Sequence, residues 1–237
     1  MLAPYERKTG WRFQSGKRKA ESRASVVETF CLAHPSAFIL YSPAMFDPAA
    51  YGPVFARLLQ TVDRCRPLMP FDSSLATSVP QADLTTEAAF AHAKVFDGEM
   101  AALCLAGVWL LYDGLDQSHQ ISQSIETADG SYWHGIMHRL EPDYANAKYW
   151  FRRVGRHPVF TRLSENAPRL VAGAPASPAQ RRLAAKSSWD PLLFVDLCEA
   201  ATRSGGPDEA LCRQVAACEW ELLFDHCYHE AVRQSTT

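Results

Sequence analysis

Residues 100–112 read MAALCLAGVWLLY, the longest uninterrupted apolar run in the chain. An α-helix rises about 1.5 Å per residue, so a helix of this length is too short to cross a bilayer. It has the length of a helix in the interior of a globular domain. Gly114 marks its end. The stretch therefore predicts a central helix that is buried on most of its sides.

Apolar residues at helical spacing predict further helices on both sides of this segment. The expected helices cover residues 54–65, 86–97, 131–141, 143–154, 191–204 and 208–233. The first can start after Asp47-Pro48 or after Gly52-Pro53, because proline is favoured at the first helical position. Residues 115–127 are polar but compatible with a helix, and they lead to an expected turn at Asp129-Gly130.

Few segments of the chain favour β-structure. Residues 26–46 mix β-branched and aromatic residues with prolines, which fits a short strand or an irregular segment. Residues 67–84 contain several prolines and serines and are expected to form a loop. Because predicted helices dominate, the expected fold class is all-α, as a single helical domain around the buried central helix.

The composition is that of an ordinary globular protein. The 237 residues are 47% hydrophobic and 21% charged, which excludes a disordered, collagen-like or coiled-coil chain. Residues 1–25 carry a net charge of +5 and indicate a flexible basic arm, with a targeting peptide or a nucleic-acid arm as alternatives. The helical domain is then expected to cover residues 26–237, with a loop or hinge at 172–178 (AGAPASP).

The number of cysteines and the net charge indicate the expected cellular compartment and the expected kind of partner. The chain has seven cysteines, an odd number without any CxxC motif, which favours buried thiols in the reducing cytoplasm over a disulfide framework. A net charge of −2 gives no indication of an anionic membrane or of nucleic acid as a partner. The expected partner is a small-molecule ligand, and nothing in the sequence indicates an oligomeric state.

One block of the sequence carries most of the chemistry. Residues 129–158 read DGSYWHGIMHRLEPDYANAKYWFRRVGRHP. The first predicted helix of this block has one apolar stripe, formed by Trp133, Ile136, Met137 and Leu140. His134, His138 and Glu141 form an adjoining stripe at positions i, i+4 and i+7. The block therefore combines a core-facing surface with a row of side chains that can bind metal or transfer protons.

Two imidazoles one helical turn apart can bind a single metal ion. Asp116 and His119 are also one turn apart, on the preceding segment. If the two segments face each other, Asp116, His119, His134 and His138 form a four-ligand site for a divalent transition metal. Gly135 stands where a metalloprotease HExxH motif has glutamate, so that mechanism is not supported.

Other roles for the same block remain open. In acid–base catalysis, His134, His138, Glu141 and Lys148 would be the catalytic residues. Trp133, Arg139, Asn146, Tyr149 and Arg152 are candidates for substrate binding. A purely structural role is the third interpretation, in which Asn146 completes a helix cap and the arginines favour the helix C-terminus. The leading hypothesis is an enzyme acting on a small polar or anionic molecule; the alternative is a non-catalytic helical scaffold for protein interactions.

The second helix of the block resembles a known helical hairpin. The stretch DYANAKYWFRRVG has Tyr144, Ala147, Trp150 and Gly155 where Sel1-type and tetratricopeptide-type hairpins have corresponding residues. The resemblance covers about residues 131–158 and implies a pair of packed helices. The chain as a whole, through its WHGIMHR and NAKYW segments, resembles an uncharacterised bacterial and fungal family, which implies no activity.

Two further histidines lie in the last predicted helix. His226 and His229 are three residues apart, in the segment CEWELLFDHCYHEA. They either approach the block or lie at the rim of the core, and the rim is the favoured interpretation because Trp220, Leu223 and Phe224 supply the apolar face.

Overall fold

The computed structural model describes residues 46–62, 64, 83–172, 178–184 and 188–234. These residues all belong to one compact unit, Ile39–Thr237. Within the described ranges there are ten α-helices, one 3-10 helix and no strand, which confirms the all-α prediction. The predictions for the basic arm, and nearly all of the predicted strand or irregular segment, lie outside the described residues.

The apolar stretch forms α4 (Gly98–Leu111), and the prediction of a buried central helix is confirmed. Asp97 caps its first turn by accepting the N–H groups of Glu99 and Met100 at 2.9 and 3.0 Å. Gly107 allows a close crossing, because a Cβ atom there would lie 2.5 Å from the Trp133 ring. Small size at one position therefore lets a large indole pack directly against the backbone of the central helix.

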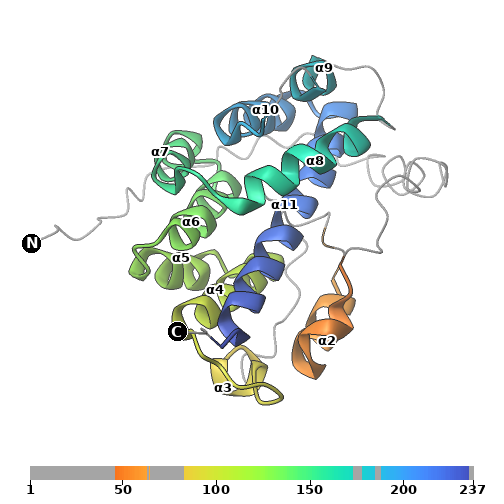
Figure 1. The fold of residues 1–237 in the computed structure, drawn as a ribbon. Coiled ribbons are helices and arrows are strands. Elements are labelled where there is room, and N and C mark those ends of the chain that lie inside the picture. Colours follow the sequence, from red (N-terminus) through yellow and green to blue (C-terminus); the bar gives the residue numbers. More distant parts are fainter. Residues whose placement is uncertain (1–45, 63, 65–82, 173–177, 185–187, 235–237) are drawn as a thin grey trace, which may run out of the picture. The chain divides into compact units, whose positions relative to one another are not determined.

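The longest helix, α11 (Pro207–Val232), joins most of the fold together (Figure 1). It packs along α4, α8, α9 and α10. Trp220 of α11 donates its indole N–H to the carbonyl of Gly107 at 2.8 Å, in the interior. The sequence prediction of a long final helix is thus confirmed, and this helix shares the core with α4.

Four helices follow one another along one side of the core. They are α4, α5 (Leu115–Ser124), α6 (Ala128–Leu140) and α7 (Tyr144–Val154), and each packs against the next (Figure 1). Asp143 caps α7 by accepting the N–H of Asn146, and Gly155 ends it with a φ of 66°. Both ends of α7 were predicted, because a side-chain cap and a left-handed residue have recognisable sequence signals.

Both predicted starts of the first helix are used. Asp47 caps the 3-10 helix η2 (Pro48–Tyr51), and α2 (Pro53–Gln60) begins directly afterwards. The chain thus forms two short helices where the sequence suggested one. α2 ends at Gln60, before the predicted end at residue 65.

The prediction of a helix over residues 86–97 is wrong. α3 (Thr86–Ala89) has only four residues. The chain then turns so that the N–H groups of Phe96 and Asp97 donate to the carbonyl of Ala231, at 2.8 and 3.2 Å. These bonds to the end of α11 replace the helical bonds that the local sequence would have allowed.

The predicted turn at Asp129-Gly130 is also wrong, since both residues lie in the first turn of α6. Thr127 is the cap, and its hydroxyl accepts the N–H of Gly130 at 3.1 Å. Glycine is needed for space: a Cβ atom at position 130 would lie 2.0 Å from the carbonyl oxygen of Ile125. The glycine that suggested a turn permits close packing instead.

Three helices complete the described fold. α10 (Pro191–Ser204) begins at the predicted cap Asp190 and packs against α7 and α11. α8 (Pro158–Ala172) and α9 (Pro178–Ala184) were not predicted, and α9 packs against α8 and α11. Residues 173–177, the centre of the predicted hinge, lie outside the described residues. Among the residues described, no helix is both long and apolar enough to pass through a bilayer.

Candidate metal centre

Three histidines from two helices meet beside α6. His119 lies on α5, and His134 and His138 lie one turn apart on α6. Since α5 packs directly against α6, these side chains converge. A ligand nitrogen from each of the three lies within 4.8 Å of the other two. We call this group the His134 cluster.

His134 is the innermost member, with 2% of its surface exposed. Its ring stacks on Trp150 of α7 at 3.9 Å between centroids and on His138 at 4.8 Å. His119 approaches edge-on at 4.7 Å. Neither ring nitrogen of His134 has a hydrogen-bond partner in the described part of the chain. A buried polar atom left in this state costs about 1–3 kcal/mol, so a ligand on these nitrogens would stabilise the fold.

His138 is held from two sides. Its Nδ1 lies 3.0 Å from a carboxylate oxygen of Glu141, and its Nε2 lies 3.0 Å from the side-chain nitrogen of Asn146. A carboxylate accepts and an amide nitrogen donates, so His138 carries its proton on Nδ1 and its lone pair on Nε2. A metal ion bound to Nε2 would therefore displace the Asn146 amide, and Glu141 on Nδ1 would then supply the carboxylate partner that is usual for metal-bound imidazoles.

Burial favours the uncharged form of two members of the cluster, His134 and His119. Removal from water, reinforced by His138 and His119, lowers the pKa of His134 from 6.5 to about 3. Burial and the neighbouring His138 also lower the pKa of His119, although the charges of Glu141 and Asp116 partly oppose this. Metal ions bind neutral imidazole, so the lowered pKa values of His134 and His119 favour the protonation state that ligation requires.

The donor set has a clear metal preference. Imidazole nitrogens suit zinc, copper, nickel and iron, whereas magnesium and calcium prefer oxygen. Zinc–nitrogen bonds of about 2.0–2.1 Å place tetrahedral ligand nitrogens roughly 3.3 Å apart. The nitrogens of the His134 cluster, all within 4.8 Å of one another, therefore need to move together only slightly. Three protein ligands leave one position of a tetrahedral ion open, as in catalytic zinc sites.

The structure gathers three of the four residues predicted as metal ligands. Asp116 is the exception: it is exposed on α5, outside the group that meets within 4.8 Å. Its charge nevertheless acts on His119, where it partly opposes the lowering of the pKa by burial and by His138. Glu141, half-exposed, and Asn146, partly buried, contact His138 and so belong to the surroundings of the cluster.

The remaining predicted residues are exposed, or they contact residues outside the cluster. The ammonium group of Lys148 pairs with Asp196 of α10 at 2.8 Å. Tyr149 and Arg152 are exposed on α7. Trp133 is fully buried, and its indole N–H donates to the sulfur of Cys227. We therefore assign Trp133 to the core.

Arg139 lies in the interior, where only 1% of its surface is exposed. Its guanidinium group pairs with Glu219 of α11 and lies 4.7 Å from the Phe194 ring. Tyr132 donates its hydroxyl to the other oxygen of Glu219 at 3.1 Å. This buried network joins α6, α10 and α11, so we assign Arg139 to structure and not to substrate binding.

Sequence reasoning missed Trp150 as a neighbour of the cluster. Trp150 covers the face of His134, and the guanidinium group of Arg153 lies 5.2 Å above Trp150. The signal for Trp150 was weak, because the contact crosses from α7 to α6. Its position one turn after Asn146 on α7 is the only local indication.

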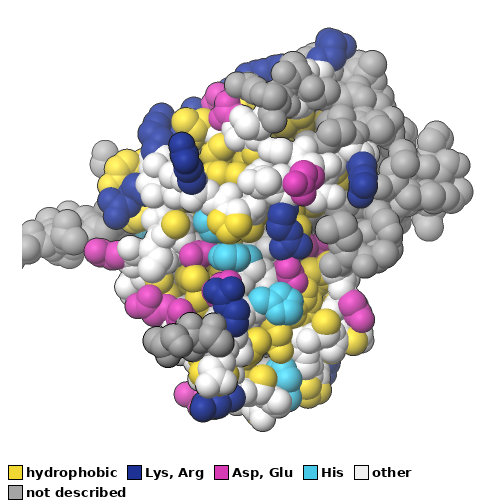
Figure 2. Space-filling view, viewed as in Figure 1, with side chains coloured by type: hydrophobic (Ala, Val, Ile, Leu, Met, Phe, Trp, Pro, Cys, Tyr) yellow, Lys and Arg dark blue, Asp and Glu magenta, His cyan; other side chains and the backbone are white. Residues whose placement is uncertain are grey.

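A second cluster brings His226 to the block of residues 129–158, which was the less favoured of the two interpretations of this histidine. Asp129 at the start of α6 lies 2.9 Å from Nε2 of His157 and 3.1 Å from Nε2 of His226. Burial by itself raises the pKa of Asp129, but the two imidazoles outweigh it and hold the pKa below its ordinary value. The three residues come from α6, from the residue before α8 and from α11. We call this group the Asp129 cluster; Figure 2 shows histidine side chains among acidic and basic ones on the face over α11.

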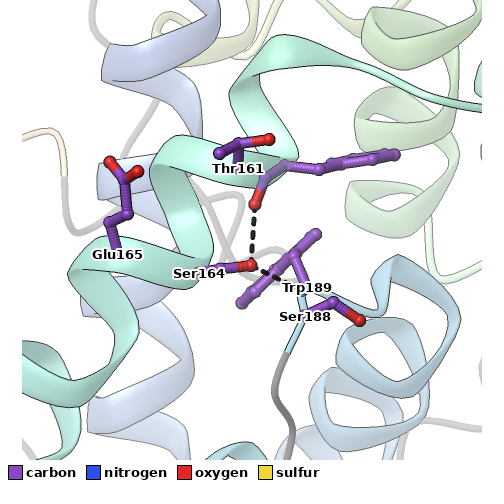
Figure 3. A pocket seen from close by; sticks show the side chains of 6 residues that line it. Thr161, Ser164, Glu165, Ser188 and Trp189 are labelled. Carbon is purple, nitrogen blue, oxygen red and sulfur yellow. Dashed lines mark hydrogen bonds between the residues drawn. The ribbon is translucent and has the colours of Figure 1, made fainter.

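A surface hollow of about 430 Å³ lies between α8 and the segment before α10 (Figure 3). It is lined by Phe160, Thr161, Ser164, Glu165, Ser188 and Trp189. Ser164 donates to the carbonyl of Phe160 and accepts the backbone N–H of Trp189 at 2.6 Å, so its hydroxyl is already engaged. None of the lining residues belongs to either histidine cluster.

Comparison with known proteins identified no relative of this chain. No protein-family model, no curated protein and no solved structure matches this chain. The Sel1-type and tetratricopeptide-type resemblance of residues 131–158 thus stays a prediction.

Proposed function

We propose that this protein is a metal-dependent enzyme that acts on a small polar or anionic molecule. His119, His134 and His138 would bind one divalent transition metal, zinc being the simplest case. The proposal depends on one observation above all: His134 is buried, yet both of its ring nitrogens lack a partner within the described residues. Such an arrangement is unfavourable unless something binds there.

The surroundings of the cluster support a catalytic site more than a purely structural one. Structural zinc sites usually have four protein ligands, whereas three histidines leave a position for substrate or water. A bound metal ion would act as a Lewis acid on a molecule in that position. Glu141 would keep His138 in the tautomer that presents Nε2, and Trp150 would exclude water from one face of His134.

Exposed basic groups on α7, the helix that carries Trp150, support the substrate class. Arg153 lies over Trp150, and Arg152 is exposed on the same helix. Guanidinium groups bind carboxylate or phosphate oxygens through paired hydrogen bonds. A small molecule with such a group could therefore be held by α7 while its reacting atom approaches the three histidines.

Metal analysis of protein purified without a histidine tag is the direct test. We expect about one zinc, nickel or copper ion per chain, and loss of this ion in His134→Ala. His92→Ala is the matched control, because His92 is an exposed imidazole that bonds Tyr228 away from the cluster. Equal metal content in both variants would rule out the site.

Fluorescence gives a second readout in the same protein. Copper and nickel ions quench a nearby indole, and Trp150 stacks on His134 at 3.9 Å. Titration with nickel should quench part of the tryptophan emission, and Trp150→Phe should remove most of that change. Quenching that persists fully in Trp150→Phe would place the ion elsewhere.

A further inference from the structure

The Asp129 cluster differs from a metal site in the way its protons are placed. The Nδ1 atom of His157 accepts the backbone N–H of Val159 at 3.2 Å, so the proton of a neutral His157 is on Nε2. That N–H donates to Asp129 at 2.9 Å. Both nitrogens of His157 are therefore used, and coordination through Nε2 would require breaking this arrangement.

His226 approaches the same carboxylate oxygen with one nitrogen only. Its Nε2 lies 3.1 Å from Oδ1 of Asp129. An ionised carboxylate only accepts, so the nitrogen beside it carries the proton. In neutral His226 the lone pair is then on Nδ1, on the opposite side of the ring. About a fifth of this side chain is exposed, so part of it is in contact with solvent.

We propose that His226 is the proton-accepting residue of a second reactive site, with Asp129 and His157 as positioning residues. The site would take the proton from water or a small alcohol, as the imidazole of a carboxylate–imidazole pair does in hydrolases. The proton passes from the oxygen to Nδ1, and the electron pair of the broken O–H bond stays on the oxygen. The site contains no residue of the His134 cluster and is independent of metal.

The neighbouring residue pair provides an internal comparison. His229 lies one turn further along α11, with Nε2 at 3.3 Å from Asp225. Its side chain is 66% exposed, against 21% for His226. The carboxylate of Asp225 is bonded to the cationic Arg162 and to the hydroxyl of Tyr51, whereas the carboxylate of Asp129 meets two imidazoles. Access alone therefore predicts that His229 is the more reactive histidine. A carboxylate whose charge is not neutralised by an arginine predicts that His226 is the more reactive one.

Diethyl pyrocarbonate is a suitable probe of this difference. The imidazole lone pair bonds to a carbonyl carbon of the reagent, monoethyl carbonate leaves with the electron pair of the broken C–O bond, and the N–H proton passes to solvent. Labelling of the full chain at pH 7, followed by mass spectrometry, gives a rate constant for each histidine. We expect His226 to react about tenfold faster than His229.

Variants separate activation from exposure. Asp129→Asn should slow labelling of His226 about tenfold, while Asp225→Asn should change it less than twofold. His134→Phe should leave it unchanged, so failure of the metal proposal and failure of this one are distinguishable. A rate for His226 no higher than that for His229 in the unmodified protein would overturn the proposal, and so would an unchanged rate in folded Asp129→Asn. The comparison of the labelling rates of His226 and His229 needs no variant, so it tests the proposal even if Asp129→Asn does not fold.

Discussion

The two histidine clusters bury imidazole in opposite ways. In the Asp129 cluster one carboxylate oxygen lies beside two imidazole nitrogens, so the buried polar atoms satisfy one another. In the His134 cluster three imidazoles surround one another, and the central ring has no partner for either nitrogen in the described structure. The first arrangement stabilises the protein as it stands, whereas the second becomes favourable when a ligand is added.

The largest expected effect is at Asp129. Replacing it by alanine leaves the N–H of His157 without its acceptor and removes a contact between α6, α8 and α11. We expect a loss of about 2–4 kcal/mol in the free energy of unfolding, measured with urea. Asp196→Ala is the control, because it removes a half-exposed ion pair with Lys148 and should cost less than about 1 kcal/mol. Equal losses in the two variants would show that the Asp129 cluster is not a structural junction.

The pH dependence of stability should separate the clusters. The pKa of His134 is about 3 in the folded protein and 6.5 ordinarily, so the unfolded chain takes up the proton first. Stability of the metal-free protein should therefore fall as the pH falls below 6.5, by about 2 kcal/mol at pH 5.

Asp129 should contribute in a different pH range. Its pKa is lowered from 3.8, so the stability it gives is present above that pH and is lost only at more acidic values. Between pH 7 and 5, His134→Phe should thus change how steeply the free energy of unfolding depends on pH. Asp129→Asn should leave this dependence unchanged. The opposite pattern would contradict the assignment of the two clusters.

A smaller effect of opposite sign is expected at His134 itself. Phenylalanine has a similar shape, keeps the stacking on Trp150 and removes two unpaired nitrogens. His134→Phe should raise the stability of the metal-free protein by about 1–2 kcal/mol and abolish metal binding. Thermal melting with and without zinc checks both parts. A destabilised variant would mean that the nitrogens of His134 have partners in solution.

The smallest effect is expected at Glu141. This residue contacts and orients His138 but is not itself one of the three proposed ligands. Glu141→Gln should weaken zinc binding about tenfold, which corresponds to roughly 1.4 kcal/mol. Stability without metal should change little, since the carboxylate is half-exposed. Calorimetric titration of the metal gives the affinity, and an unchanged value would remove Glu141 from the site.

The part of the site that was predictable from the sequence is the part determined by one helix. His134 and His138 share a face because they are four residues apart, and Glu141 follows on the same side. His119 could be added because α5 directly precedes α6 in the chain. Neighbouring helices joined by a short connection usually pack together, and this brought three of the four predicted ligands to one place.

Contacts between distant segments were not predictable in this way. Arg139 looked available for substrate because its partner Glu219 is 80 positions away on α11. The same holds for Asp129 and His226, which meet only when α6 and α11 pack. α8 was missed because prolines at 158 and 168 argue against a helix, although the first lies at its N-terminus, where proline is tolerated.

The core joins parts of the chain that are made at very different times. Gly107 and Trp220, which are bonded in the interior, are 113 positions apart, and the carbonyl of Ala231 accepts the N–H groups of Phe96 and Asp97. During synthesis α4 therefore leaves the ribosome long before α11 can cover it. At typical rates of translation the apolar surface of α4 that α11 covers in the folded protein is therefore uncovered for several seconds.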